Sequence, residues 1–173
     1  GLNLLQRNIT KLREDVNTDP LTGLGNRRHL EAAIASFESQ ALAFAVIAID
    51  IDHFKRINDS FGHDTGDEVL RQLAHTMRDV SRAGDVACRV GGEEFLLLLP
   101  CTALEAAAQA AERLRLLVEE MEIPQIGRIT ISLGVAHWPE TDDDIKTVFL
   151  QADAMLYAAK HGGRNQVMVQ RSS

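Results

Sequence analysis

Two carboxylates follow directly after a pair of glycines in the stretch Gly91-Gly92-Glu93-Glu94-Phe95. Paired glycines accept the positive φ angles that a two-residue hairpin turn requires, so the stretch predicts a tight turn between two strands. Because glycine carries no side chain, a phosphate group could also approach the backbone there. Carboxylates at a hairpin tip suit a bound cation, although an ordinary hairpin with solvated glutamates would show the same residues.

Asp50 is a further carboxylate, and it ends an apolar run over 43–49 that is typical of a buried strand. Asp52 shares its side of the extended backbone, because side chains alternate along a strand. Neighbouring strands could bring Asp50 close to Glu93. Two carboxylates and a backbone oxygen suit Mg²⁺, which keeps several waters and completes its coordination with substrate phosphates. Such a site could activate an attacking hydroxyl and stabilise a leaving pyrophosphate.

Side chains that could bind the rest of a nucleotide lie elsewhere in the chain. Lys55, Lys160 and Arg164 are candidate phosphate partners, and the last two lie near a predicted helix end. Cations at that position also simply stabilise the helix dipole, by about 0.3–1 kcal/mol each. Asn58 and Asp67 offer an amide and a carboxylate that could recognise a guanine edge. Helix and turn capping would use the same two residue types, so both interpretations stay open.

The chain has 173 residues, a length that suits one domain with a short extension. With 45% hydrophobic and 25% charged residues, its composition is that of a soluble globular protein. A net charge of −7 favours neither nucleic acid nor an anionic membrane, so we expect neither as a partner. No apolar run of about 18 residues occurs. The two cysteines, Cys88 and Cys101, are expected to be buried in a reducing compartment, which favours the cytoplasm.

Periodicity and breaker residues predict helices that alternate with strands. Asn26 can cap an early helix, and Gly162-Gly163 can end the last one. The predicted helices cover 27–38, 54–60, 68–80, 103–120 and 141–160, with a turn at 62–67. The predicted strands cover 43–49, 86–90, 96–99, 128–136 and 166–170. One strand pair is a hairpin, so the sheet is mixed, and the fold class is an α/β (α+β) sandwich of the split βαβ kind.

Residues 1–17 predict a helix that precedes this domain. Apolar residues recur there at alternating spacings of three and four, at Leu2, Leu5, Ile9, Leu12 and Val16. This is the seam of a coiled coil, but it covers only about two heptads, and a firm assignment needs three or four. A helix packed on its own domain is an equal alternative. We therefore divide the chain into an N-terminal signalling helix over 1–17 and a main domain over 18–173.

Several segments together resemble one known family. They read, in chain order, DPLTGLGNRR, DIDHFKRINDSFGHDTGDEVL, GGEEF and ADAMLYAAKHGGRNQ. These segments resemble the motifs of the GGDEF family of diguanylate cyclases, and the resemblance runs from about Asp19 to Asn165. It implies a nucleotide-cyclase or palm-like fold with a mostly antiparallel sheet and flanking helices. It also implies the family reaction, in which two GTP molecules become cyclic di-GMP and two pyrophosphates across a homodimer of domains.

The resemblance implies specific roles in catalysis. Asp50, Glu93 and the Ile51 carbonyl would bind Mg²⁺ or Mn²⁺, and Lys55 would assist at the phosphates. Glu93 would also help to deprotonate the ribose 3′-hydroxyl, although a metal-bound hydroxide would serve too. The third motif position is Glu rather than Asp, which the family accepts. His53 stands where the family often has an aromatic residue, and we expect no loss because the backbone would contact the phosphate there.

The resemblance also implies how the substrate is held. Asn58 and Asp67 would contact guanine, and Asp67 disfavours a cyclase for adenine, whose N1 is unprotonated. The remaining substrate contacts would come from Gly91 and Gly92, which line the nucleotide, and from Lys160 and Arg164, which hold its terminal phosphates.

Arg82 and Asp85 form an R-x-x-D pair five residues before Gly91. That is the spacing of the family's product-inhibition site, with Arg113 as a further contact for cyclic di-GMP. A local ion pair, which contributes about 0–1 kcal/mol, is the alternative. We therefore read the chain as an active diguanylate cyclase with product feedback, controlled by an upstream sensor domain outside this chain. The alternative is a catalytically silent domain that binds GTP or cyclic di-GMP as a regulatory module.

Overall fold

The computed structural model describes residues 3–139 and 144–171, except for the side chains of residues 9–15. Its centre is a sheet of five strands in the order β2-β3-β1-β4-β5. All neighbouring strands pair antiparallel except β4 and β5, which are parallel. The mixed, mostly antiparallel sheet with flanking helices is therefore confirmed. The strands are β1 Phe44–Ile51, β2 Val86–Arg89, β3 Glu94–Pro100, β4 Ile131–Trp138 and β5 Val167–Val169.

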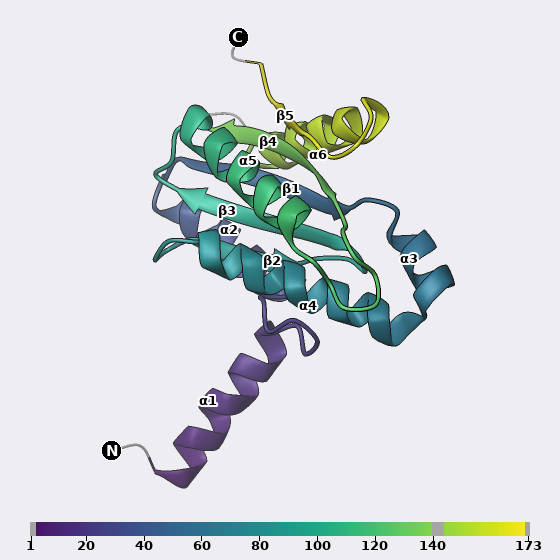
Figure 1. Ribbon diagram of the computed structural model, residues 1–173. Helices are drawn as coiled ribbons and strands as arrows, with labels where there is room; N and C mark the ends of the chain where they lie inside the picture. Colours follow the sequence, from purple (N-terminus) through teal and green to yellow (C-terminus); the bar gives the residue numbers. More distant parts are fainter. Residues whose placement is uncertain (1–2, 140–143, 172–173) are drawn as a thin grey trace.

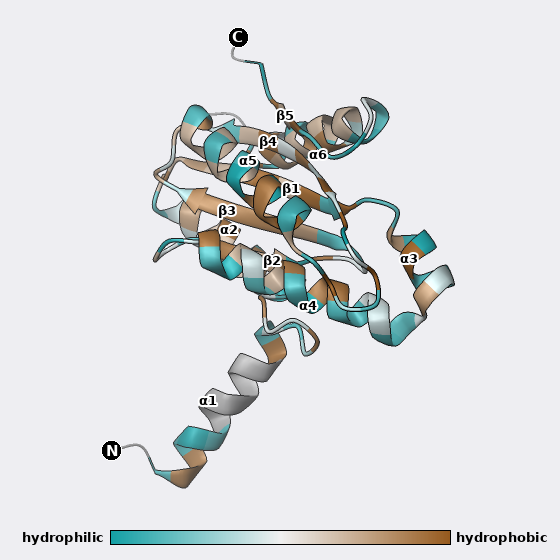
Figure 2. Cartoon of the chain, in the orientation of Figure 1, coloured by the Kyte–Doolittle hydropathy of each residue, from teal (hydrophilic) through white to brown (hydrophobic). Residues whose placement is uncertain are grey.

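Helices cover both faces of this sheet (Figure 1). One apolar cluster joins α4 and α5 to the sheet, and a second cluster joins α2 and α6 to its other face. Figure 2 shows the apolar colour concentrated in the strands and on the inward sides of the helices. The helices are α1 Leu4–Asn17, α2 Arg27–Ser39, α3 Phe54–Phe61, α4 His63–Val80, α5 Leu104–Glu120 and α6 Lys146–His161.

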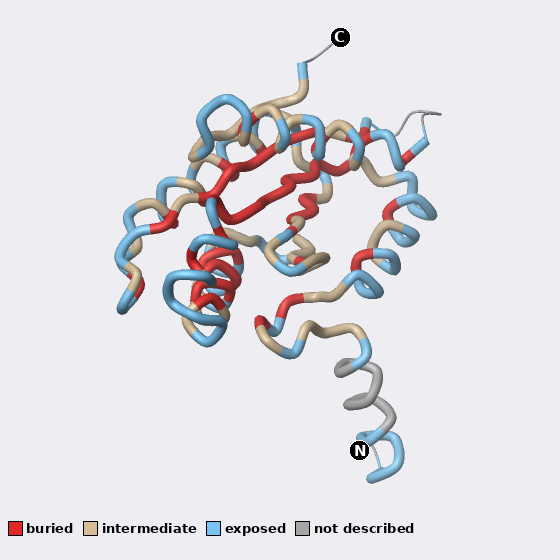
Figure 3. Tube along the Cα trace, turned by 90° about the vertical axis from the view of Figure 1, so that its right-hand side faces the viewer, coloured by how far each residue is buried: buried red, intermediate tan, exposed pale blue. Residues whose placement is uncertain are grey.

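Every residue of β1 is buried because helices cover both sides of this central strand (Figure 3). Ala45, Ile47 and Ile49 face the α4–α5 cluster, while Phe44, Val46 and Ala48 face the α2–α6 cluster. This explains why the strand reads as a continuous apolar run rather than an alternating one. By the same alternation, Asp50 faces the α2–α6 side.

Three predicted boundaries are wrong. The segment 62–67 is not a turn, because α4 begins at His63 and Gly62 alone, at φ 88°, redirects the chain between α3 and α4. The strand predicted over 128–136 begins at Ile131. The start of the helix predicted over 141–160 falls partly outside the described residues, and α6 as described begins at Lys146.

The cysteine prediction is right for one residue and wrong for the other. Cys88 of β2 is buried in the α2–α6 cluster, and burial raises the pKa of its thiol to about 11. Cys101 is exposed after β3, at φ 54°.

Helix α1 projects from the body of the domain, and its N-terminal end lies far from the sheet (Figure 1). Asn3 begins it with a capping box, in which Asn3 and Gln6 bond each other's backbone N–H. Of the predicted seam, Leu5 is 68% exposed and Val16 is 46% exposed, so these two do not pack on the domain. Leu2 and the side chains of Ile9 and Leu12 lie outside the described residues. The coiled coil, and the division of the chain at 17, stay predictions.

No helix among the described residues has both the length and the apolar character needed to cross a lipid bilayer.

Candidate active site

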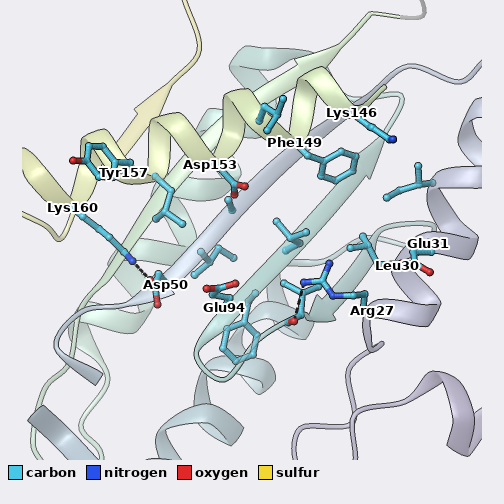
Figure 4. Close-up of a pocket in the computed structure, with 18 residues that line it drawn as sticks. Arg27, Leu30, Glu31, Asp50, Glu94, Lys146, Phe149, Asp153, Tyr157 and Lys160 are labelled. Atoms are coloured by element: carbon cyan, nitrogen blue, oxygen red, sulfur yellow. Dashed lines mark hydrogen bonds and ion pairs between the residues drawn. The ribbon is translucent and has the colours of Figure 1, made fainter. Parts of the chain in front are cut away.

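The pairing of β1 with β3 decides which carboxylates meet. Asp50 lies directly opposite Glu94 in the antiparallel register, so Glu94 rather than Glu93 is its cross-strand neighbour. Both line a cavity of about 680 Å³ between α2 and α6. Figure 4 shows the two side chains on the floor of this cavity, which we call the α2–α6 cavity. Glu93 precedes β3 and does not line this cavity, and burial followed by the charge of Glu94 raises its pKa.

Sequence reasoning missed Glu94, because the uniformly apolar run over 95–99 does not show which of its residues face which side of the sheet. Phe95 and Leu97 belong to the α4–α5 cluster, while Leu96 and Leu98 belong to the α2–α6 cluster. Alternation along the strand then places Glu94 on the same face as Asp50. Asp153 of α6 is a third carboxylate that lines the cavity, and burial followed by the charge of Glu94 raises its pKa.

Asp50 has only one of its two carboxylate oxygens satisfied. Lys160 reaches down from α6 and pairs with Oδ2 (Figure 4). Oδ1 is buried and has no hydrogen-bond partner among the described residues. An unsatisfied buried acceptor costs roughly 1–3 kcal/mol, so this oxygen favours a cation or a donor that arrives with a ligand. Burial, followed by the charge of Arg164, lowers the pKa of Lys160.

The donor set fits a hard divalent cation that also takes ligands from a substrate. In residues 3–139 and 144–171, no group of three or more His, Cys, Asp or Glu side chains is placed to hold a metal ion. Asp50 and Glu94 supply two carboxylates on one face, and Ile51 follows Asp50 at the end of β1. Mg²⁺ is commonly held by one or two carboxylates with waters and phosphates as the other ligands.

The glycine pair does not form the predicted two-residue turn. Arg89 pairs with Phe95, and the Val90 and Gly91 N–H groups donate to the Glu94 carbonyl at 2.9 and 3.3 Å, so the loop is longer. Neither glycine has a positive φ. Gly91 is small for another reason, because a Cβ there would lie 3.0 Å from the Glu94 carboxylate. A Cβ on Gly92 would meet nothing within 4 Å, so this backbone is open to a ligand.

Arg89 ties this hairpin to the turn that follows α1. Its guanidinium donates to the Gly92 carbonyl at 2.7 Å and pairs with the Asp19 carboxylate at 3.3 Å. Burial alone would raise the pKa of Asp19, but hydrogen bonds from Thr22 and the Arg89 charge lower it overall. Arg89 therefore holds the tip of the hairpin against Asp19, which lies at the start of the domain.

The predicted guanine contacts lie on α3 and α4. Asn58 Oδ1 is buried without a partner, and a Cβ on Gly66 would lie 1.8 Å from it, so only glycine fits there. In the described part of the chain, neither Asn58 nor Asp67 makes a side-chain hydrogen bond that would cap a helix. The capping alternative is therefore not supported. Lys55 of α3 is exposed and does not line the α2–α6 cavity.

Asp52 does not join Asp50 in the cavity. Its carboxylate accepts hydrogen bonds from Thr130 Oγ1 at 2.7 Å, from Ser132 Oγ at 2.6 Å and from the Asn165 backbone N–H at 3.0 Å. The neighbouring Arg164 is exposed, with a φ of 63°, and its charge reaches Lys160. The structure thus brings Lys160 to Asp50, while Arg164 acts on Lys160 through its charge but does not itself line the cavity.

A second cavity, of about 230 Å³, lies between α5 and the loop before β2. Arg82, Asp85 and Arg113 all line it. The Asp85 carboxylate accepts from the Arg82 backbone N–H at 2.8 Å, and no ion pair joins their side chains in the described part of the chain. Burial raises the pKa of Asp85. The ion-pair alternative is therefore not supported, and the guanidinium groups remain available to a ligand.

A sequence profile described as "Diguanylate cyclase, GGDEF domain" matches residues 16–166. The chain belongs to the GGDEF family.

Among curated GGDEF relatives, diguanylate cyclase DgcM of Escherichia coli K12 is 43% identical over 162 residues, covering 91% of this chain. The response regulator PleD of Caulobacter vibrioides is 40% identical over 173 residues, covering 95% of this chain. The chain spans only 39% of the length of DgcM and 38% of the length of PleD.

Solved GGDEF structures share the fold. The coiled coil and GGDEF domain of DgcB from Caulobacter crescentus, in complex with c-di-GMP, superposes with a TM-score of 0.86 at 34% identity, covering 96% of this chain and 92% of that one. The active GGEEF domain of a Vibrio cholerae diguanylate cyclase superposes with a TM-score of 0.74 at 40% identity, covering 82% and 92%.

Proposed function

We propose that this GGDEF domain is a diguanylate cyclase, which joins two GTP molecules into cyclic di-GMP and releases two pyrophosphates. The observation that carries the proposal is the Asp50–Glu94 pair in one cavity with Lys160, where a buried Asp50 oxygen lacks a partner. Relatives at 36–43% identity that bear the name diguanylate cyclase support it.

The nucleotide would bind across two parts of the domain. The Asp67 carboxylate matches the N1–H and amino donors of guanine, and the buried Asn58 Oδ1 needs a donor that guanine can supply. The phosphates would then lie over the open backbone of Gly92, with Lys160 and Arg164 at their terminal end. Alignment and charge neutralisation would supply most of the rate enhancement.

The proposed metal ligands are Asp50, the Ile51 carbonyl and Glu93, and Glu94 joins them because its register places it opposite Asp50. Mg²⁺ or Mn²⁺ bound there would neutralise phosphate charge and activate the attacking hydroxyl. Glu93 at the hairpin tip is the proposed acceptor of the ribose 3′-hydroxyl proton. Lys160 would leave Asp50 for the phosphates when a cation binds, because both partners are then satisfied.

Two chains would be needed for one product, because each domain holds one copy of each motif. The exposed Leu5 of α1 supports pairing of these helices. Cyclic di-GMP would bind Arg82, Asp85 and Arg113 in the second cavity and inhibit the enzyme. We place the domain in the cytoplasm under the control of an upstream sensor domain.

The test is product chromatography after incubation with GTP and Mg²⁺. We expect cyclic di-GMP from the unmodified chain and from Glu38→Gln, a matched carboxylate change on the exposed side of α2. Asp50→Asn should give none. Nucleotide binding without any product from the unmodified chain would overturn the cyclase proposal in favour of a silent regulatory module.

A further inference from the structure

The turn after α6 holds two consecutive non-glycine residues in the left-handed region. Arg164 has a φ of 63° and Asn165 a φ of 47°. Asparagine tolerates this conformation better than most residues, but arginine does not. Such conformations persist only where the surroundings hold them. The turn therefore needs contacts with other parts of the domain to hold it, and these contacts also set the position of Arg164.

One restraint comes from the end of β1. The Asn165 backbone N–H donates to Asp52 Oδ2 at 3.0 Å. Asp52 is 4% exposed, and Thr130 and Ser132 hold its carboxylate in place through their hydroxyl groups. Asp52 follows Asp50 by two residues, so the strand end that carries Asp50 also sets the position of the Arg164–Asn165 turn.

A second restraint comes from α5. Arg115 Nη1 donates to Asn165 Oδ1 at 2.9 Å, and Asn165 Nδ2 donates to Glu119 Oε2. Glu112 and Glu119 in turn hold the Arg115 guanidinium, at 3.0 Å from Nε and 3.4 Å from Nη1. The backbone N–H and both polar side-chain atoms of Asn165 are therefore bonded to residues far away in sequence.

Arg164 itself is unrestrained beyond its backbone. Its N–H donates to the Ala159 carbonyl at 3.0 Å, while its exposed guanidinium makes no hydrogen bond within the described residues. Asn165 is thus held by several hydrogen bonds, whereas the guanidinium of Arg164 beside it makes none with the described residues and is close enough to Lys160 for its charge to lower the pKa of that residue.

We propose that Asp52, Arg115 and Glu119 are positioning residues that act through Asn165 to hold Arg164 against the terminal phosphates of the nucleotide. The inference rests on the proposed function, in which Arg164 binds those phosphates. It adds that the phosphate-binding turn is held from α5, a helix that otherwise packs on the opposite face of the sheet from the α2–α6 cavity.

The experiment is a double-mutant cycle read by calorimetric binding of a non-hydrolysable GTP analogue to the whole chain with Mg²⁺. Arg164→Met should weaken binding about ten- to hundredfold, because it removes hydrogen bonds between charged groups. Arg115→Met should weaken binding about tenfold, within the range that an ångström-scale misplacement can cost. The double variant should bind no more weakly than Arg164→Met alone, because Arg115 acts only through Arg164.

Two further variants separate positioning from folding. Asn165→Gly keeps the backbone N–H and tolerates the positive φ, so it removes only the side-chain bonds to Arg115 and Glu119. It should reproduce the loss seen in Arg115→Met, even if Arg115→Met itself folds poorly. Arg128→Met is the matched control, because Arg128 is exposed and, among the described residues, its one ion pair is with Glu122 at 3.9 Å. It should bind the analogue as the unmodified chain does.

The outcomes distinguish the two proposals. Unchanged binding in Arg164→Met would remove the phosphate role of Arg164 and the inference with it. Weaker binding in Arg164→Met, together with unchanged binding in Asn165→Gly or fully additive losses in the cycle, would overturn the positioning network alone.

Discussion

The α2–α6 cavity and the second cavity lie at opposite ends of β2, and the net charges of their lining side chains have opposite signs. The α2–α6 cavity gathers Asp50, Glu94 and Asp153, with Lys160 already paired to Asp50. The second cavity presents Arg82 and Arg113, with a single carboxylate, Asp85. Arg27 and Lys146 also line the first cavity, but there the carboxylates outnumber the cations by one, whereas in the second cavity the cations outnumber the carboxylate by one. A phosphate ligand should therefore enter the second cavity more readily, whereas in the first a metal ion would offset the excess of carboxylates.

The largest effect should come from the two glutamates of the hairpin. Glu93→Gln and Glu94→Gln keep side-chain size but remove charge from the acidic cavity and its rim. We expect each to lower the rate of cyclic di-GMP formation by about a hundredfold or more, because Glu93→Gln removes the proposed proton acceptor and Glu94→Gln removes a proposed metal ligand. Circular dichroism should show an unchanged fold. A near-normal rate in Glu94→Gln would show that Glu94 has no role in catalysis, although it lies opposite Asp50 in the sheet.

Base selection should change next. Asp67→Ala leaves guanine donors unpaired, at a cost of about 1–3 kcal/mol, so GTP should lose about five- to 150-fold in kcat/KM relative to ATP. Competition between the two nucleotides measures this ratio directly. If the preference for guanine persisted, Asp67 would have no contact with the base.

The arginine-rich cavity should respond differently from the acidic one. Arg82→Ala should leave turnover unchanged at low product concentration, because the residue lies at the far end of β2 from the hairpin. The concentration of cyclic di-GMP that halves the rate should rise about tenfold or more, since hydrogen bonds to charged groups are lost. An unchanged inhibition curve would deprive this cavity of its role in feedback.

The smallest effect should come from α1. Leu5→Asp places a charge on an exposed apolar position, and helices of this length are marginal in water outside a tertiary contact. Specific activity should fall a few-fold at fixed protein concentration, while GTP affinity per chain stays constant. A dilution series with sedimentation checks this. Constant specific activity at concentrations where only monomer sediments would contradict the two-chain mechanism.

Local patterns predicted most elements of the fold. The apolar run over 43–49 predicted β1, and Asn26 was correctly identified as the cap of α2, where its side chain accepts from the His29 N–H at 3.0 Å. Both features depend on residues within one turn or one strand. The α4 start was wrong because Gly62 changes the chain direction in a single residue, and no local pattern distinguishes that from a longer turn.

The resemblance named Asp50 and Lys160 of the α2–α6 cavity and all three charged residues of the second cavity, but it did not show which hairpin carboxylate faces Asp50. The motif named Glu93 and Glu94 side by side, and only the pairing of β3 with β1 showed which of them lies opposite Asp50. Register joins segments more than forty residues apart, so it depends on the packing of both sheet faces rather than on either segment.

The sequence by itself determined the order of helices and strands, the burial of β1 and the identity of the charged groups, because periodicity and residue type are local properties. Only the tertiary structure decided that Asp52 turns away from Asp50, and that α5 reaches the Arg164–Asn165 turn through Arg115. Those contacts join residues 52, 115 and 165, which lie fifty or more positions apart, so no local sequence pattern could have predicted them. They form because leaving a buried polar group without a partner costs free energy, so most such groups find one once the sheet has closed over them.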